Sequence, residues 1–220
     1  MFNLPFEDRA DAGRLLGAEL AARAPLLNPI VLALPRGGVP VGVEVAAALE
    51  APLDVMVVRK LGVPWQPELA MGAIAGSTCV LEDQMIRELR ISKDEVAAVV
   101  ARETLELARR EKLYRSGQPA LDVRGRTVVL VDDGLATGST MVAAARNVRS
   151  AGPLRLIVAV PVGSAQACAR MRKEADECLC LALPEPFFGV GEWYNDFRQV
   201  TDTEVQEMLK RSHSPVAAIP

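Results

Sequence analysis

The chain has 220 residues, of which 50% are hydrophobic and 24% are charged. This composition predicts a globular protein with a substantial core and excludes a disordered chain or a fibre. The 25 basic and 28 acidic residues give a net charge of −3, and only 4% of the residues are aromatic. We therefore expect no nucleic-acid partner, because neither a basic face nor a set of stacking rings is indicated.

The chain has a single histidine and four cysteines. The histidine, His213, lies in a polar segment near the C-terminus, where we expect a solvated side chain. One histidine also excludes a multi-histidine metal centre. The cysteines have no C-x-x-C spacing, which predicts buried reduced thiols rather than disulfides or a zinc site. They are Cys79, Cys168, Cys178 and Cys180.

No segment has the character of a targeting or membrane sequence. Acidic residues occur within the first eight positions, and no apolar h-region precedes them, so no signal peptide is expected. The longest stretch without a charged residue, Leu156–Ala169, contains Pro, Gly, Ser and Gln and is too short to span a membrane. We therefore expect a cytoplasmic protein without a membrane partner.

Helical periodicity alternates with continuous apolar runs along the chain. This alternation predicts an α/β fold, with a parallel twisted sheet of about five strands flanked by helices. The elements expected in chain order are a helix at Glu7–Arg23, a strand at Ile30–Leu34, a helix at Val39–Leu49, a strand at Asp54–Val58, a helix from Lys93 to about Arg115, a strand at Thr127–Val131, a helix at Ser139–Ser150, a strand at Arg155–Val160, a helix at Ala165–Ala175, a strand at Glu177–Leu183 and a last helix after Thr201.

One long helix interrupts this rhythm. Ser92 and Glu95 form a capping box that opens it, and Glu106–Arg110 is one of its i,i+4 pairs. We interpret residues 84–116 as a helical insertion that packs on the sheet or on a partner subunit. The Pro and Gly residues of Gly62–Pro67 and Ser116–Pro119 indicate loops.

The most informative segment is Val128–Thr140, in which a buried strand ends in Asp132 and Asp133. Ligands of open α/β sheets bind outside the carboxyl ends of the strands. The next residues present backbone N–H groups and three hydroxyls at a helix N-terminus, where an anion such as phosphate is favoured. They are Ala136, Thr137, Gly138, Ser139 and Thr140. The acid pair suits hydroxyl donors or a metal ion, so the pattern describes a ribose 5-phosphate.

Two other classes of protein also end a strand in acids, but neither fits this chain. A P-loop ATPase needs a G-x-x-x-x-G-K-[ST] segment, which the chain lacks. A response-regulator receiver has paired acids after its first strand, whereas Asp132 and Asp133 come too late in the chain.

Three motifs in the same order resemble the type I phosphoribosyltransferases, which use 5-phosphoribosyl-1-pyrophosphate (PRPP). Val128–Thr140 resembles their PRPP signature, Leu34–Gly38 resembles their pyrophosphate loop, and Val58–Lys60 resembles the edge from which their flexible loop leaves. From Glu7 through Val205 the chain is most similar to a bacterial group of predicted phosphoribosyltransferases without an assigned substrate.

The resemblance implies one phosphoribosyltransferase-like domain over residues 1–211, with residues 212–220 as a disordered tail. Pyrophosphate would be bound by Arg36, Gly37, Gly38, Arg59 and Lys60. Glycines let backbone N–H groups approach a phosphate, and arginine offers a planar fork of donors. The family also places a cis peptide bond in the pyrophosphate loop, which here is Pro35–Arg36.

The implied reaction is displacement of pyrophosphate from C1 of PRPP by a nitrogen nucleophile. The catalytic residues would be Asp132, Asp133 and Arg36, and the two acids would hold the ribose hydroxyls directly or through Mg²⁺. Residues 61–77 would form a lid that excludes water. The family usually forms homodimers, so we expect one here.

The acceptor is a nucleobase or a related amine, and it would lie under a hood made of residues 1–10 and 184–200. Phe188, Trp193 and Tyr194 are the hood residues expected to contact a flat ring. Hypoxanthine-guanine enzymes have an Asp where this chain has Ala136, which places a 6-oxopurine mechanism in doubt. Two other functions stay open, a PRPP-sensing regulator without catalysis and a phosphohydrolase-like enzyme that acts on a phosphorylated sugar.

Overall fold

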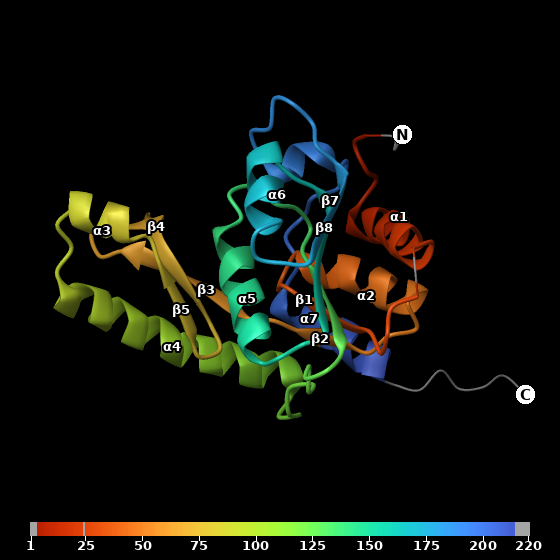
Figure 1. Ribbon diagram of the computed structural model, residues 1–220, viewed down its shortest axis with the longest axis horizontal. Helices are drawn as coiled ribbons and strands as arrows, with labels where there is room; N and C mark the ends of the chain where they lie inside the picture. The colour runs from red at the N-terminus through yellow and green to blue at the C-terminus, as the bar shows by residue number, and fades with distance from the viewer. Residues whose placement is uncertain (1–3, 24, 214–220) are drawn as a thin grey trace, which may run out of the picture.

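Five parallel strands form the centre of the molecule in the computed structural model, which describes residues 4–23 and 25–213 (Figure 1). Their order is β2-β1-β6-β7-β8. The strands are rich in Val, Ile, Leu and Ala residues, as expected for strands covered on both faces. The strands are β1 (Ile30–Ala33), β2 (Leu53–Val55), β6 (Thr127–Val131), β7 (Arg155–Val162) and β8 (Glu177–Ala182).

Helices cover both faces of this sheet, which confirms the predicted fold class. One face packs against α1 (Arg9–Ala21), α2 (Gly38–Ala48) and α7 (Asp202–His213). The other packs against α5 (Ser139–Ser150) and α6 (Ala165–Met171). Successive side chains of a strand point to opposite faces of the sheet, so each strand contributes side chains to the hydrophobic core on each face.

Residues 58–115 form an arm that extends away from the central sheet beyond α5 (Figure 1). The arm contains a three-stranded antiparallel sheet in the order β3-β4-β5 and two helices. Its elements are β3 (Val58–Val63), β4 (Gln66–Ala75), β5 (Thr78–Leu81), α3 (Asp83–Glu88) and α4 (Lys93–Arg115).

The arm corrects two expectations from the sequence. The segment Asp54–Val58 is not one strand, because β2 ends at Val55 and β3 begins at Val58. Residues 61–77 are not a loop, since most of them belong to β3 and β4. Gly62, which suggested a loop, lies at a register shift where the carbonyl oxygen of Pro67 comes within 2.4 Å of the position that a Cβ would take. The predicted loop at Gly62–Pro67 is therefore confirmed only as the short turn at residues 64 and 65, while Gly62 forms a bulge inside β3.

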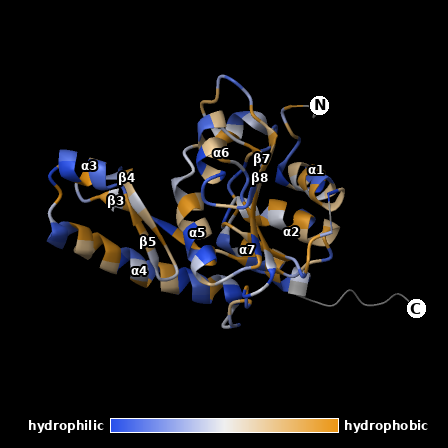
Figure 2. Cartoon of the chain, viewed as in Figure 1, coloured by the Kyte–Doolittle hydropathy of each residue, from blue (hydrophilic) through white to orange (hydrophobic). Residues whose placement is uncertain are grey.

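Helix α4 has the bounds that its capping box predicts. The Ser92 hydroxyl accepts from the backbone N–H of Glu95, and the Glu95 carboxylate accepts from the backbone N–H of Ser92. Hydrophobic and hydrophilic residues alternate in bands along the helix (Figure 2), with Val99 and Leu107 on the buried side. This face packs mainly against β3, as well as β2, β4 and α7.

The two segments predicted to form a hood meet beyond the carboxyl ends of the strands. Phe6 forms a parallel bridge with Tyr194, and its backbone N–H donates to the carbonyl of Trp193 at 2.9 Å. The rings of Phe6 and Tyr194 are 5.6 Å apart. A short 3-10 helix, η1 (Val190–Trp193), precedes this contact. Residues 1–3 of the predicted hood lie outside the described residues.

Smaller expectations also need correction. Helix α7 extends through Ser212, whose hydroxyl donates to the carbonyl of Met208, so the predicted tail begins too early; residues 214–220 lie outside the described residues. Helix α6 ends at Met171 rather than at residue 175. Cys79 is exposed, contrary to the expectation of buried thiols, while Cys168 is buried. In the described part of the chain, no helix is both long and apolar enough to cross a membrane.

The arm is joined to the central sheet by a buried ion pair, and its removal should destabilise the fold. Arg115 donates to Asp54 at 3.0 Å, and the two side chains are only 13% and 5% exposed. We expect Asp54→Asn to lower the free energy of unfolding by about 3 kcal/mol, because the buried Arg115 guanidinium then keeps only its longer ion pair with Glu111, at 3.5 Å. Urea denaturation followed by circular dichroism measures this change.

The matched control is Asp122→Asn, which breaks an ion pair with Arg124 whose side chains are 63% and 77% exposed. We expect this control to change the free energy of unfolding far less than Asp54→Asn does, because solvent screens an exposed ion pair. Equal effects of the two substitutions would contradict the structural importance of the Asp54–Arg115 pair.

Candidate functional site

Two adjacent carboxylates follow the central strand β6 and form the centre of the candidate site. Asp132 and Asp133 are half-buried, and the backbone N–H of Asp133 donates to Oδ1 of Asp132 at 2.9 Å. Burial raises the pKa of both carboxyls, and the charge of Asp133 raises the pKa of Asp132 further. Two anions held this close favour ligands that supply hydroxyl donors or positive charge.

The glycine turn after β1 packs directly against these acids. A Cβ on Gly37 would lie 2.0 Å from Oδ2 of Asp133, and a Cβ on Gly38 would lie 2.9 Å from the Cα of Asp132. The peptide bond Pro35–Arg36 in this turn is cis, as the resemblance implies. Besides allowing close approach of a ligand, glycine is therefore needed at both positions because a side chain there would collide with the acid pair.

Arg9 is a residue of this site that the sequence reasoning missed. Its Nε donates to Oδ2 of Asp133 at 2.8 Å, and one terminal nitrogen donates to the carbonyl of Arg198 at 2.9 Å. Its guanidinium lies 3.8 Å from the centre of the Phe197 ring. One signal could have found it, because Arg9 shares a helical face with the buried Ala12 and Leu16. A charged residue on an apolar face needs a buried partner.

The predicted anion-binding loop joins β6 to α5. Gly138 is the N-cap of α5 with φ +79°, a left-handed conformation that favours glycine. The hydroxyls of Thr137 and Ser139 are 3.3 Å apart, and Ala136 and Thr137 are exposed. The Ser164 hydroxyl holds the loop from behind by donating to the carbonyl of Ala136 at 2.8 Å. The exposed side of this loop and the start of α5 are therefore open to an anion.

Arg36, the cation of the glycine turn, extends toward α7. Its guanidinium lies 3.9 Å from Oδ1 of Asp202, and the Tyr114 hydroxyl donates to the same oxygen at 2.7 Å. Burial first, and then the hydrogen bond to Asp202, raise the pKa of Tyr114 to about 12. Arg36 is one-third exposed, and its ion pair with Asp202 is long.

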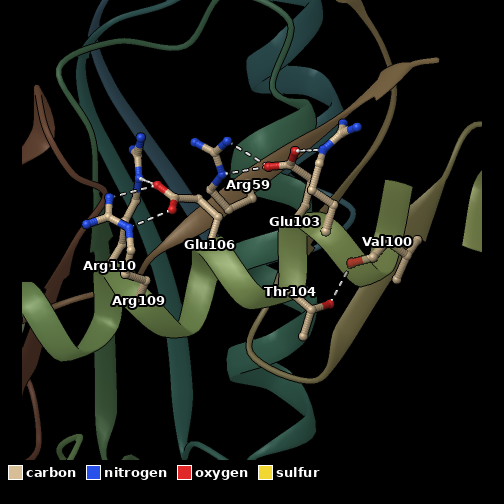
Figure 3. A network of polar contacts seen from close by, with 8 residues as sticks. Arg59, Val100, Glu103, Thr104, Glu106, Arg109 and Arg110 are labelled. Atoms are coloured by element: carbon tan, nitrogen blue, oxygen red, sulfur yellow. Dashed lines mark hydrogen bonds and ion pairs between the residues drawn. The ribbon is translucent and has the colours of Figure 1, made fainter. Parts of the chain in front are cut away.

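The other two predicted cations, Arg59 and Lys60, belong to β3 of the arm. Arg59 donates twice to one oxygen of the buried Glu103 on α4, at 2.9 and 2.6 Å, and Arg102 donates to the other oxygen at 3.0 Å (Figure 3). Although burial opposes the change, these hydrogen bonds lower the pKa of Glu103. Arg59 therefore contacts α4 in this state rather than the glycine turn, whereas Lys60 is exposed.

A second carboxylate on the same helix also holds two arginines. Glu106 accepts from Arg109 at 2.7 Å and from Arg110 at 2.8 Å (Figure 3). Hydrogen bonds from these arginines lower the pKa of Glu106 to about 2. Each of the two glutamates thus binds two guanidinium groups, which leaves this part of α4 and β3 with an excess of positive charge.

The three predicted hood residues occupy different environments. The Tyr194 hydroxyl donates to the backbone carbonyl of Asp133 at 2.5 Å, which joins the hood to the acid pair. The indole N–H of Trp193 is buried and has no partner among the described residues. Phe188 is 80% exposed. Tyr194 therefore stabilises the backbone of the acid pair. The ring of Phe188 lies on the surface of the molecule.

The carboxyl ends of β1 and β6 thus carry an acid pair, a glycine turn with an arginine, and an open anion-binding loop. A cavity of about 450 Å³ lies elsewhere, between α4 and α7, where Asp54, Tyr114 and Leu209 line it. The site is therefore identified by its polar groups and by its place in the sheet rather than by cavity volume.

Comparison with known proteins agrees with this arrangement. The phosphoribosyl transferase domain family matches residues 9–196. Rv0571c and MT0597, from two strains of Mycobacterium tuberculosis and provisionally named phosphoribosyl transferases, are each 46% identical to this chain over 216 residues. These matches cover 96% of this chain and 48% of theirs, so the chain spans about half the length of these curated relatives.

A solved structure has a similar sequence and the same fold. TT1426 from Thermus thermophilus is 42% identical, with a TM-score of 0.82, and the match covers 96% of this chain and all of that one. The order of the strands, the acid pair, the glycine turn and these relatives agree, and the chain belongs to the phosphoribosyl transferase family.

Proposed function

We propose that the chain binds PRPP and transfers its phosphoribosyl group to a nitrogen of a nucleobase or related amine, with release of pyrophosphate. The observation that carries the proposal is the packing of Asp133 and Asp132 against Gly37 and Gly38. This packing sets a pair of acids suited to ribose hydroxyls beside a turn suited to pyrophosphate. Membership of the phosphoribosyl transferase family supports the same reaction.

Each part of PRPP has a matching group at this edge of the sheet. The 5-phosphate would accept hydrogen bonds from backbone N–H groups and hydroxyls of residues 136–140, at the N-terminus of α5. The ribose hydroxyls would donate to Asp132 and Asp133. The pyrophosphate would lie on the glycine turn with Arg36, and Arg59 and Lys60 would add positive charge from the arm.

The proposed reaction forms a bond from the acceptor nitrogen to C1 of the ribose and breaks the bond from C1 to the pyrophosphate oxygen. Positive charge develops on the ribose ring as this bond breaks, and the two carboxylates stabilise it. Arg36 stabilises the departing negative charge. The contact between Phe6 and Tyr194 closes one side of the site and limits access of water.

Mg²⁺ fits the donors of this site. It prefers oxygen ligands and is usually bound by one or two carboxylates together with substrate phosphates. Asp132 and Asp133 are adjacent carboxylates of this kind, and the phosphates of bound PRPP would supply further oxygen ligands. When bound, Mg²⁺ would neutralise part of the negative charge on the pyrophosphate.

The hood supports a flat acceptor. Trp193 provides a ring and an indole N–H that lacks a partner among the described residues, and such a buried donor is expected to find an acceptor when the region opens. Ala136 takes the place of the Asp of the hypoxanthine-guanine enzymes, and this absence of a carboxylate favours an acceptor other than a 6-oxopurine. A role in nucleotide salvage, a cytoplasmic location and a homodimer are finer parts of the same proposal.

The direct test incubates the chain with PRPP and Mg²⁺ and a panel of nucleobases and amines. We expect one or more acceptors to give pyrophosphate and a product heavier than the acceptor by one phosphoribosyl group. Binding of PRPP without any product across the panel would favour the sensor function instead. Pyrophosphate release without a ribosylated product would favour a phosphohydrolase-like enzyme.

The acid pair should be essential for turnover. We expect the double substitution Asp132→Asn with Asp133→Asn to lower PRPP turnover by roughly a hundredfold or more, because the stabilising charges beside the ribose are lost. Asn keeps the size of each side chain and an oxygen for Arg9, so the circular dichroism spectrum should stay unchanged. Retention of turnover by this variant would reject the mechanism.

Release of Arg59 from its ion pair with Glu103 should increase the affinity of the chain for PRPP. We expect Glu103→Gln to tighten PRPP binding by roughly threefold to tenfold, since a neutral amide competes less well for the guanidinium. Isothermal titration calorimetry measures the affinity. The control is Glu111→Gln on the same helix, which removes a 3.5 Å ion pair with Arg115 but leaves the shorter pair of Arg115 with Asp54, and which should leave PRPP affinity unchanged. Unchanged or weaker binding by Glu103→Gln would show that Arg59 does not contact PRPP.

A further inference from the structure

We infer that Arg9 is a positioning residue that orients the Asp133 carboxylate for the ribose of PRPP and joins it to the hood. This inference rests on the proposed function. It assigns a role to a residue of α1, which lies outside the three motifs that carry the family resemblance.

Arg9 is fixed in one orientation by three kinds of contact. Its guanidinium lies over the Phe197 ring at 3.8 Å, and it donates both to the carbonyl of Arg198 and to Asp133. Only 10% of its side chain is exposed. A planar group held by a ring and two acceptors has little rotational freedom, so its donor nitrogens have defined directions.

The contact with Arg9 in turn restricts Asp133. The Nε–H of Arg9 takes Oδ2, the Gly37 backbone packs against the same oxygen, and the Tyr194 hydroxyl holds the backbone carbonyl. The plane of the carboxylate is therefore fixed, and Oδ1 is the oxygen left to accept from a ribose hydroxyl. A carboxylate oriented in advance binds with less loss of conformational freedom.

Arg9 also connects the acid pair to the second part of the hood, residues 184–200. Tyr194, Phe197 and Arg198 all belong to this part, and the Tyr194 and Phe197 rings are 5.2 Å apart. A movement of this segment would move the acceptors of the Arg9 guanidinium, and through Arg9 it would reorient Asp133. The contacts thus couple the position of this hood segment to the orientation of the ribose-binding carboxylate.

The buried position distinguishes this role from direct binding of a polyanion. A pyrophosphate ligand needs exposed donors, whereas the guanidinium of Arg9 is enclosed by Phe197 and its two acceptors. Loss of Arg9 should therefore weaken binding of molecules that contain the ribose and spare pyrophosphate itself.

The experiment compares Arg9→Met and Arg9→Lys with the unsubstituted chain by isothermal titration calorimetry. Each protein is titrated with PRPP and separately with inorganic pyrophosphate, both with Mg²⁺. We expect Arg9→Met to weaken PRPP binding by about tenfold or more, the usual effect of losing a hydrogen bond to a charged group. Pyrophosphate binding should change by less than about twofold. Arg9→Lys, which keeps the charge, should recover part of the PRPP affinity.

A double-mutant cycle tests whether Arg9 acts through Asp133. In an Asp133→Asn background, Arg9→Met should cost clearly less PRPP affinity than it does alone. Full additivity, or an equal loss of PRPP and pyrophosphate binding by Arg9→Met, would overturn the inference. If Arg9→Met does not fold, the comparison of Arg9→Lys with the unsubstituted chain decides, and equal losses for both ligands would overturn it. Absence of PRPP binding by the unsubstituted chain would instead reject the proposed function.

Discussion

The close contact between the Asp133 carboxylate and the Gly37 backbone is the constraint on which the site depends. Neighbouring parallel strands bring the ends of β1 and β6 together, and the turn after β1 must then pass the acid pair without a Cβ in the way. The two motifs are almost a hundred residues apart in sequence, yet neither can change side-chain size without displacing the other. Glycine here serves packing as much as ligand approach.

The contact also buries the two acids, and burial disfavours their charged forms. Burial raises the pKa of both acids, and the guanidinium of Arg9 is the counter-charge that the fold supplies from α1. Tyr194 ties the hood to the backbone at the same point. The site thus combines segments from the start, the middle and the end of the chain. On the arm, Glu103 and Glu106 form ion pairs with arginines, so these carboxylates balance part of the positive charge of the arm.

Much of the fold could be predicted from local patterns. The bounds of β6, α4 and α5 agree with the predicted ranges, since each is marked by a clear period or a cap. The arm sheet could not be predicted, because the Gly and Pro residues of 62–67 indicate the turn at residues 64 and 65 but not the strands on either side of it. The acid pair and the glycine turn pack against each other, as the order of the motifs along the chain suggests, while the ligands assigned to them and to residues 136–140 stay predictions. Arg9 was missed because its contact with Asp133 joins residues 124 positions apart. The pairing of Arg59 with Glu103 was missed for the same reason.

The most direct test of this account is a crystal structure of the chain with PRPP and Mg²⁺ bound. The account predicts that the 5-phosphate lies on residues 136–140, that the ribose hydroxyls contact Asp132 and Asp133, and that the pyrophosphate lies on Gly37 and Gly38. PRPP bound away from the acid pair, or bound with its phosphates exchanged between the two loops, would contradict it.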